Sequence, residues 1–321
     1  MFTREGCLEE LKLRVAKLSP AAEGVVVLDL RGEANQVLPS FQPGAHIELR
    51  LPIGVPRCYS LCGEPTDGDR YHVAVALAEQ SRGGSSYIHR TLAAGDTLLT
   101  SPPRNNFPLV EEAASYQFIA GGIGITPIIT MVRWCEQRGR AWRLLYLLRS
   151  RRNAAFLSEI ETFGDKVNLH FDDEAGHLFD VESFLRGVRS DTHIYCCGPS
   201  ALMEAVEKST ADRLPGHVHF EWFTQRDIAG ARNESFTVVL ARSGREITVA
   251  PNQSILEALE AEGINVSFSC REGLCATCET AVLAGTPEHR DQILTPAERD
   301  AGKTMMICVS RAASDSITLD L

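Results

Sequence analysis

The sequence contains no apolar run that approaches the roughly 20 residues that a membrane-spanning helix needs. Its first residues, MFTREGCLEE, carry acidic side chains where a secretory signal would be apolar. Basic residues are in the minority, since 32 Lys and Arg stand against 42 Asp and Glu, for a formal net charge of -10. That sign is wrong for a surface that gathers nucleic-acid phosphates. We therefore expect a cytoplasmic protein that binds neither membranes nor nucleic acids.

The chain also lacks a Ser-His-Asp grouping, a metal-hydrolase pattern, internal repeats and low-complexity tracts. Its 321 residues are too many for one comfortable hydrophobic core and suit two or three domains. Hydrophobic residues make up 44% and charged residues 23%, which is close to the average for globular proteins and excludes disordered, collagen-like and fibrous classes. We expect a folded, multidomain protein.

The first hundred residues alternate apolar and polar positions in short runs such as VVVLDL, HIELRL and YHVAVAL. This period of two, interrupted by Gly and Pro, is typical of antiparallel strands. The turn-rich segment 101–109 then ends the pattern. We predict a small antiparallel barrel or sandwich over residues 1–109.

A different hydrophobic pattern begins at Tyr116, where continuous apolar runs typical of buried strands are each followed by a helical pattern. Such alternation predicts an α/β domain with a parallel sheet of strand-helix-strand units, over residues 110–226. The segment 224–235 is polar and rich in small residues, so it is predicted to be a linker between domains.

The last part of the chain predicts a third, mixed domain over residues 235–321. The run FTVVLARSGREITV is typical of a hairpin about Ser243 and Gly244. It is followed by SILEALEAEG, a short amphipathic helix that ends at Gly263.

Ten cysteines in a chain of this kind indicate metal or redox chemistry rather than disulfides. Six are scattered, and the other four form one pattern: Cys270, Cys275, Cys278 and Cys308. Their C-x4-C-x2-C spacing, with the fourth cysteine after 29 intervening residues, supplies the four thiolates of a 2Fe-2S cluster, two for each iron. Gly273, Ala276 and Thr277 are small enough to let the backbone approach a cluster. Structural zinc is the alternative, although zinc usually takes paired C-x2-C knuckles.

The segment RCYSL places Arg57, Tyr59 and Ser60 at the start of an apolar strand, and its Arg-x-Tyr-Ser pattern is similar to the flavin motif of ferredoxin reductases. Tyr59 can pack against an isoalloxazine ring, Ser60 can hydrogen-bond near the flavin N5, and Arg57 can pair with a phosphate. The alternative is an ordinary strand with a surface arginine and a half-buried tyrosine.

The segment RGGSSYIHR adds a second candidate contact with a flavin phosphate. Its members precede a predicted helix: Arg82, Gly83, Gly84 and Ser85, with Ser86 beside them. Glycines expose the backbone amides, a serine is predicted to cap the helix, and the N-terminus of a helix favours an anion. A generic Gly-Ser turn is the alternative.

The loop GGIGITP lies between a predicted strand and a predicted helix and is a candidate diphosphate-binding loop. Gly121, Gly122 and Gly124 free its backbone. Thr126 is predicted to be the N-cap residue and Pro127 the first helical residue. The loop departs from the G-x-G-x-x-G fingerprint at Pro127, but it is similar to the nucleotide module of the ferredoxin reductase superfamily.

Two further strand ends carry candidate nucleotide contacts. In IYCCGP these are Cys197, Gly198 and Pro199, which follow a strand where ligands bind in open parallel sheets. In HFEWFT the candidate is Phe223, whereas Phe220 and Trp222 suit core packing. For Cys197 the alternative is a buried, small hydrophobic side chain.

The segment 149–152 contains three arginines that follow a strand and could meet either a ribose or an extra 2'-phosphate. These arginines weaken the case for strict use of NADH. A solvated loop is the alternative.

The cysteine motif CREGLCATC with the distant Cys308 resembles plant-type ferredoxins. Its place behind two other domains, and the ending VSRAASDSITLDL, resemble the phthalate dioxygenase reductase family of oxygenase reductases. The resemblance implies a β-barrel domain that binds FMN, an α/β domain that binds NADH, and a β-grasp ferredoxin domain with a 2Fe-2S cluster. In that family the position of Ala276 is commonly Gly.

The same resemblance implies roles for three residues and a partner. Hydride would pass from the nicotinamide to the flavin beside Ser60, with Cys197 under the nicotinamide and Phe223 near the flavin ring. Single electrons would then reach a Rieske non-haem iron oxygenase through a transient complex, with this chain a monomer. Plausible oxygenase substrates are aromatic acids such as phthalates, phenoxybenzoates or vanillate.

Two other functions stay open from the sequence. One is a reductase for another acceptor, such as a quaternary-amine monooxygenase, and the other is a non-enzymatic redox sensor. A self-sufficient monooxygenase or a flavohaemoglobin would need a further domain for its oxygen-activating centre. The surface charges Arg271 and Glu272 beside the cluster are candidate partner contacts.

Overall fold

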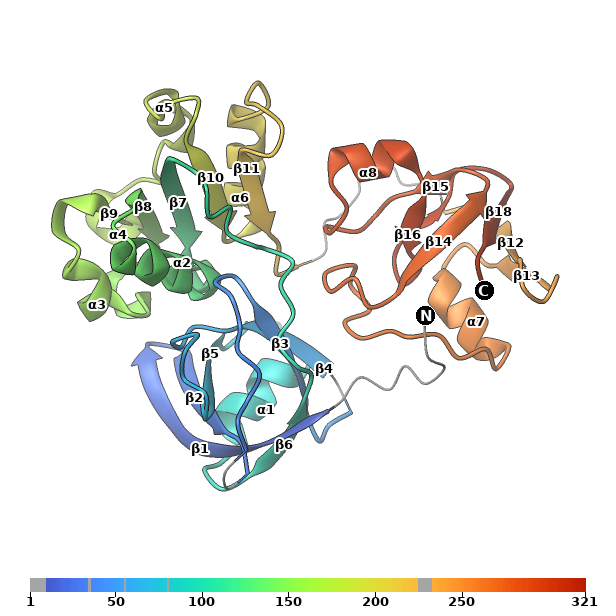
Figure 1. Ribbon diagram of the computed structural model, residues 1–321, viewed down its shortest axis with the longest axis horizontal. Helices are drawn as coiled ribbons and strands as arrows, with labels where there is room; N and C mark the ends of the chain where they lie inside the picture. The colour runs from blue at the N-terminus through green and yellow to red at the C-terminus, as the bar shows by residue number, and fades with distance from the viewer. Residues whose placement is uncertain (1–9, 34–35, 55, 80, 225–232) are drawn as a thin grey trace. The chain divides into compact units, whose positions relative to one another are not determined.

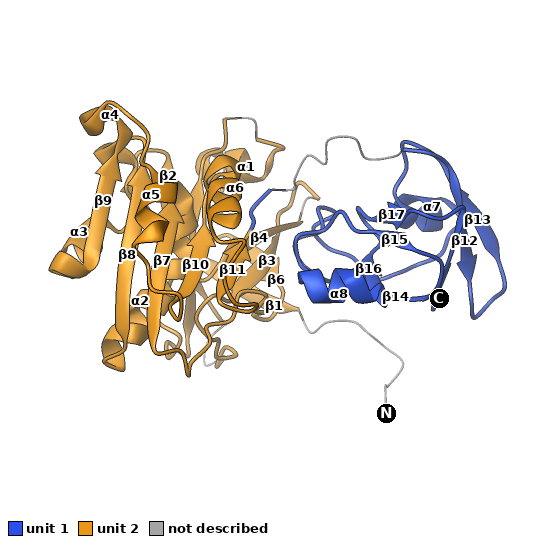
Figure 2. Ribbon diagram, turned by 90° about the horizontal axis from the view of Figure 1, so that it is seen from above, with its two compact units in different colours: residues 1–6, 222–321 blue, residues 7–221 orange. Residues whose placement is uncertain are grey.

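The computed structural model describes residues 10–33, 36–54, 56–79, 81–224 and 233–321. The chain forms two compact units, one that extends to Glu221 and one that begins at Trp222 (Figure 2). The first unit contains two sheets, and the second contains a smaller mixed sheet. No helix among the described residues is both long and apolar enough to cross a membrane. Every described cysteine is a free thiol.

An antiparallel six-stranded sheet opens the first unit, in the order β4-β3-β6-β1-β2-β5 (Figure 1). Its strands are β1 (Leu11–Ala22), β2 (Val25–Arg31), β3 (His46–Arg50), β4 (Pro56–Ser60), β5 (Arg70–Ala76) and β6 (Thr97–Thr100). A bridge between Leu61 and Val73 joins its two edges, and helix α1 (Gly84–Arg90) follows β5. Alternate side chains such as Leu28 and Leu30 fill the interior. The predicted antiparallel barrel is confirmed.

The second sheet of this unit is parallel, in the order β11-β10-β7-β8-β9. Its strands are β7 (Ser115–Gly121), β8 (Ala141–Leu148), β9 (Val167–Phe171), β10 (His193–Cys197) and β11 (Val218–Glu221). The helices are α2 (Ile125–Gln137), α3 (Leu157–Glu161), α4 (Asp172–Ala175), α5 (Val181–Arg186) and α6 (Ser200–Ser209). The strand order reverses between β7 and β10, and open parallel sheets bind ligands at such a switch point, beyond the carboxyl ends of the strands.

The second unit carries a mixed sheet in the order β13-β12-β18-β14-β16 and a short pair, β15-β17. Its strands are β12 (Phe236–Leu240), β13 (Glu246–Val249), β14 (Glu279–Ala284), β15 (Pro287–Glu288), β16 (Thr304–Met306), β17 (Arg311–Ala312) and β18 (Ser316–Leu319), and its helices are α7 (Ile255–Ala261) and α8 (Pro296–Ala301). Only β12 and β18 pair in parallel, whereas the other described pairs are antiparallel. The α+β ferredoxin class is confirmed.

Local sequence explains the two elements that begin this unit. Gly244, with a positive φ of 69°, turns the chain between β12 and β13. Ser254 and Glu257 form a reciprocal capping box that begins α7. Gly263, with a φ of 69°, follows the helix as predicted.

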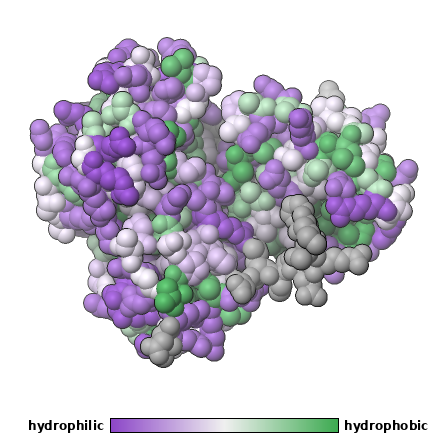
Figure 3. Space-filling view, viewed as in Figure 1, coloured by the Kyte–Doolittle hydropathy of each residue, from purple (hydrophilic) through white to green (hydrophobic). Residues whose placement is uncertain are grey.

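Hydrophobic residues on the surface occur in separate groups among hydrophilic ones on the face shown in Figure 3. Val37, Leu178 and Leu283 are among the exposed large hydrophobic residues. Scattered side chains of this kind are normal for a folded domain.

The predicted linker 224–235 lies largely outside the described residues, because 225–232 are not described. The three domain boundaries drawn from the sequence therefore stay predictions.

Candidate functional site

Two glycine-containing loops meet at the switch point of the parallel sheet. A Cβ atom on Gly124 would lie 2.1 Å from the carbonyl oxygen of Cys197, and one on Gly121 would lie 2.6 Å from Cδ of Pro199. A Cβ on Gly198 would lie 3.0 Å from the backbone of Gly121. Such contacts tolerate only glycine, so the structure brings together the predicted nucleotide residues from β7 and β10.

The helix after the first loop begins earlier than the sequence predicts. Residues Gly122–Gly124 form a 3-10 turn, Gly124 is the N-cap residue, and α2 begins at Ile125. The prediction that Thr126 is the N-cap is therefore wrong, because its hydroxyl donates to the Ile123 carbonyl at 2.9 Å from inside the first turn. Pro127 is the third helical residue rather than the first, a position in the first turn that still needs no backbone donor.

The Arg-x-Tyr-Ser motif occupies β4, which pairs with β3 so that Ser60 lies opposite His46. Ser60 is buried and Tyr59 is partly buried, and burial raises the pKa of Tyr59 to about 12. The stem of Arg57 packs on Gly84, where a Cβ would lie 2.9 Å from its Cγ. The structure thus brings the two predicted flavin segments side by side.

The start of α1 corrects a second cap prediction. Gly83 is the N-cap residue, with a φ of 98°, and no side chain at that position caps the helix. The hydroxyl oxygen of Ser81 instead accepts from the amides of Gly83 and Ser86, both at 3.2 Å. Ser85 lies inside the helix and donates to Ser81 at 3.0 Å, and Arg82 is exposed. Phosphate binding at this turn stays a prediction.

Sequence reasoning missed Glu221, which joins the two candidate sites. The hydroxyl of Ser60 donates to a carboxylate oxygen of Glu221 at 3.2 Å, and β10 pairs with β11 so that Cys197 lies opposite Glu221. Burial raises the pKa of Glu221 to about 8, although the hydrogen bond from Ser60 lowers it. Burial, followed by the charge of Glu221, raises the pKa of the Cys197 thiol. The available signal was an acidic residue within the otherwise apolar strand end HFEW.

The arginines after β8 are paired with carboxylates. Arg149 lies 3.4 Å from Glu79, and Arg151 lies 2.9 Å from Glu161 and 3.3 Å from Glu174. A 2'-phosphate would have to compete with these pairs, although exposed pairs of this kind are weak. The pairing therefore gives the loop no strong preference between NADH and NADPH.

Phe223 follows β11 and is partly buried. It belongs to the second unit, which begins at Trp222. Its predicted place near the flavin ring therefore stays a prediction.

The four predicted metal ligands gather in the second unit. The thiol of Cys270 interacts with those of Cys275 and Cys308, and the thiol of Cys278 interacts with that of Cys308. The amides of Glu272 and Leu274 point at the sulfur of Cys270, at 3.3 and 3.4 Å. Hydrogen bonds from Cys275 and Cys308 lower the pKa of Cys270, and one from Cys308 lowers the pKa of Cys278.

This donor set fits a two-iron cluster better than a single zinc ion. The four thiols come from a C-x4-C-x2-C loop and one distant cysteine, and not from the paired C-x2-C knuckles that are usual for zinc. A structural zinc site would bring four ligands to one tetrahedral point, whereas a 2Fe-2S cluster spreads its four thiolates over two irons. Backbone amides directed at sulfur are the contacts that tune such a cluster.

The cluster loop has an unusual backbone. Arg271 and Ala276 have φ values of 58° and 60°, in the left-handed region that costs a non-glycine residue about 1–2 kcal/mol. Gly273 also has a positive φ, of 67°, and a Cβ there would lie 2.6 Å from Cγ2 of Val309. The loop is therefore pressed against the segment that follows Cys308.

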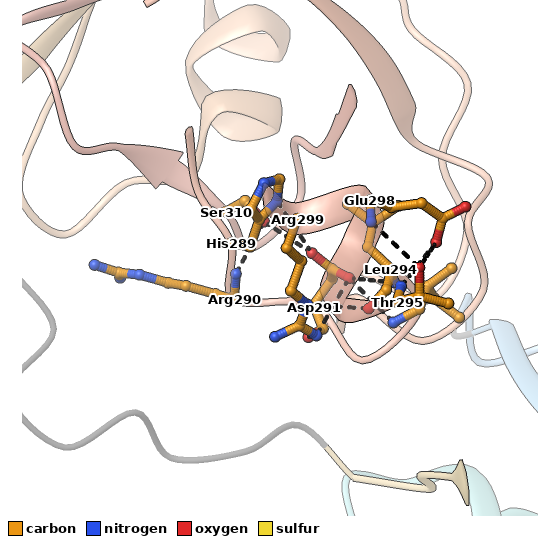
Figure 4. A network of polar contacts seen from close by, with 9 residues as sticks. His289, Arg290, Asp291, Leu294, Thr295, Glu298, Arg299 and Ser310 are labelled. Atoms are coloured by element: carbon orange, nitrogen blue, oxygen red, sulfur yellow. Dashed lines mark hydrogen bonds and ion pairs between the residues drawn. The ribbon is translucent and has the colours of Figure 1, made fainter. Parts of the chain in front are cut away.

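A polar network is centred on Asp291, whose neighbour Gln292 contacts the cluster loop (Figure 4). The buried carboxylate of Asp291 accepts from the amides of Ile293 and Leu294, at 3.0 and 2.8 Å, and lies 3.7 Å from the guanidinium of Arg299. The next residue, Gln292, donates its amide to the carbonyl of Gly273 at 3.0 Å. The network thus supports the cluster loop through the backbone hydrogen bond between Gln292 and Gly273.

Comparison with known sequences agrees with this arrangement. The family described as the 2Fe-2S iron-sulfur cluster binding domain matches residues 238–313. The phenoxybenzoate dioxygenase subunit beta of Ectopseudomonas oleovorans is 44% identical over 97% of this chain and 97% of its own length. The phthalate dioxygenase reductase of Burkholderia cepacia is 38% identical over 97% of each chain.

Two solved structures are similar over almost the whole chain. A structure titled phthalate dioxygenase reductase, a modular structure for electron transfer from pyridine nucleotides to [2Fe-2S], is 37% identical and covers 98% of both chains, with a TM-score of 0.72. An intact type IV self-sufficient cytochrome P450 monooxygenase is 39% identical with a TM-score of 0.89, and this chain spans 41% of its length.

Proposed function

Because this chain belongs to the phthalate dioxygenase reductase family, we propose that it carries electrons from NADH through FMN and a 2Fe-2S cluster to a partner oxygenase. The relatives include reductase subunits of dioxygenase and monooxygenase systems. Bound together, a flavin that accepts hydride and a cluster that accepts one electron at a time convert a two-electron donor into a one-electron source.

The main support for this proposal is that the fold assembles two separate sites, each from residues that lie apart in the sequence. One is the meeting of Ser60, Glu221 and Cys197 at the switch point. The other is the set of four thiols with backbone amides directed at Cys270. A nonenzymatic redox sensor would need only the second.

The chain's own residues have separable roles at the first site. Gly121 and Gly124 let the two loops of the nucleotide site pack closely against each other. The backbone amides at the start of α2 would then meet the diphosphate of the dinucleotide. Arg57 and the α1 turn would hold the flavin phosphate, and Tyr59 would pack against the ring. Ser60 would present its hydroxyl at the reacting edge, and its partner Glu221 holds a proton there at neutral pH because of the raised pKa.

The remaining expectations extend this proposal. The partner would be a Rieske non-haem iron oxygenase that acts on an aromatic acid, met in a transient complex with a monomeric reductase. The domain boundaries would be 1–109, 110–226 and 235–321. We place the protein in the cytoplasm, where a reducing environment suits a chain whose described cysteines form no disulfide.

The test combines spectroscopy with kinetics on the purified full chain. Flavin released by heating is identified by chromatography, iron and sulfide are counted, and NADH-driven reduction of cytochrome c is compared with that driven by NADPH. FMN, two irons with two sulfides, and a higher kcat/KM for NADH are expected. Flavin-free protein, or protein that reduces no one-electron acceptor, would contradict the proposal.

A further inference from the structure

Helix α2 joins the candidate nucleotide loop to the barrel, although only its first residues take part in the site described above. Its N-cap, Gly124, belongs to the loop that meets Cys197. Six residues further on, the hydroxyl of Thr130 accepts from the amide of Gly44 in the barrel, at 3.3 Å. The same helix then presents Arg133.

Arg133 makes polar contacts both to the barrel, at Cys62 and Glu64, and to α3 of its own domain, at Glu159. Its Nη1 donates to the carbonyl oxygen of Cys62 at 2.7 Å. Its Nε and Nη2 donate to the two carboxylate oxygens of Glu159 at 2.6 and 2.7 Å, and Glu64 lies 3.5 Å away. The side chain is only 17% exposed, so solvent weakens these charged contacts less than it would on the surface.

The acceptor on the barrel lies close to the reacting residue of the flavin motif. Cys62 is two residues beyond Ser60, and its own amide donates to the His72 carbonyl at 2.9 Å. The backbone just beyond Ser60 is thus held at Cys62 by two hydrogen bonds, one to His72 of β5 and one from Arg133. Arg133, which makes this contact, lies on the helix that Gly124 begins.

We propose that Arg133 is a positioning residue for hydride transfer, which holds the strand end at Ser60 in fixed register with the nucleotide loop at the start of α2. This inference rests on the proposed function. A near-attack geometry is sensitive to displacements of about 1 Å, which can cost up to about 100-fold in rate. A planar guanidinium with five donors can serve Cys62 and Glu159 together, and a lysine ammonium cannot match that fork.

The experiment compares Arg133→Met, Arg133→Lys and the control Arg138→Met in the full, flavin-loaded chain. Arg138 is exposed at the end of the same helix and lies over the ring of Trp134, so it controls for loss of an arginine from α2. Stopped-flow absorbance gives the limiting rate of flavin reduction by NADH and by NADH deuterated at the transferred position. Titration with NAD+ gives nucleotide affinity.

The limiting rate is expected to fall at least tenfold in Arg133→Met and by a smaller factor in Arg133→Lys, with flavin content and NAD+ affinity within twofold of the parent. Arg138→Met should stay within twofold in every quantity. A merely structural role would lower flavin content or thermal stability and leave the rate of the loaded fraction unchanged. That result would overturn the proposal.

Two further measurements keep the test decisive. If Arg133→Met yields no loaded protein, Glu159→Gln removes the charged fork but leaves the bond to Cys62, and a threefold or larger fall in the rate is expected. Hydrogen exchange without nucleotide should be faster around Gly44 and Cys62 in Arg133→Met than in Arg138→Met, and equal exchange would overturn the proposal. Parent protein that NADH does not reduce would contradict the proposed function, whereas the exchange experiment would still test the contact.

Discussion

Glu221 should make the free energy of unfolding depend on pH, and a single substitution should remove that dependence. Its pKa is raised from 4.5 to about 8 by burial, so the folded chain keeps a proton that the unfolded chain has already lost. Between these values the folded state binds more protons, and the free energy of unfolding therefore falls as pH rises, then levels off above 8. Glu221→Gln keeps a group that can accept from Ser60 but has no proton to lose, so this fall should disappear.

The magnitude is worked out over the pH interval between the usual pKa of histidine and the raised pKa of Glu221. Burial lowers the pKa of His219 to about 4 from 6.5, so His219 changes stability below pH 6.5 and in the opposite direction. From pH 6.5 to 8, Glu221 accounts for about 2 kcal/mol at about 1.4 kcal/mol per pKa unit. The carboxyl of Glu221 is buried, but the residue as a whole keeps some contact with solvent, which screens part of this effect. We therefore expect about 1 kcal/mol, or roughly 3 °C in the unfolding temperature of a unit of this size.

The assay is thermal unfolding of the flavin-loaded protein, followed by flavin fluorescence at several pH values between 6.5 and 9. The unfolding temperature of Glu221→Gln, measured relative to the parent, should rise by roughly 3 °C across this range. Glu204→Gln, an exposed substitution on α6, should show no such trend. A parallel pH dependence in Glu221→Gln and the parent would refute the reasoning about the buried carboxyl.

Three other substitutions test the remaining parts of the site. Cys275→Ser should leave reduction of ferricyanide by NADH but lower reduction of cytochrome c by more than tenfold, and loss of both activities would contradict separate sites. Gly124→Ala would place a Cβ 2.1 Å from the Cys197 carbonyl, so KM for NADH should rise at least tenfold while flavin content is kept, and an unchanged KM would count against the loop. Ala276→Gly removes the strain of a non-glycine residue at a φ of 60°. The greater conformational entropy of glycine in the unfolded chain offsets part of this gain, so we expect up to about 1 kcal/mol of net stabilisation. Iron should be lost more slowly on heating, and faster loss would contradict this expectation.

Features that depend on local spacing were predictable from the sequence. The cysteine pattern from Cys270 to Cys278, the alternation in β2 and the stop at Gly263 each involve residues that are neighbours along the chain. The parallel sheet was also predictable from a local pattern, because strands that are buried on both faces are continuously apolar.

Features that depend on packing between distant segments were not predictable in the same way. Ser60 and Glu221 are 161 residues apart, and no local pattern indicates that Glu221 pairs with Ser60. Arg133 likewise resembles a solvated helix residue until Cys62 and Glu159 are placed beside it. The cap predictions at Thr126 and at the serines before α1 failed because a 3-10 turn and the hydroxyl of Ser81 offered the backbone a competing arrangement.

The most direct test of the account is an anaerobic titration of the purified protein with NADH, followed by EPR spectroscopy. If Cys270, Cys275, Cys278 and Cys308 hold the cluster that receives electrons from NADH, the signal of a reduced two-iron centre should grow to about one spin per chain. A chain that consumes NADH and bleaches its flavin, yet gives no iron-sulfur signal, would contradict it.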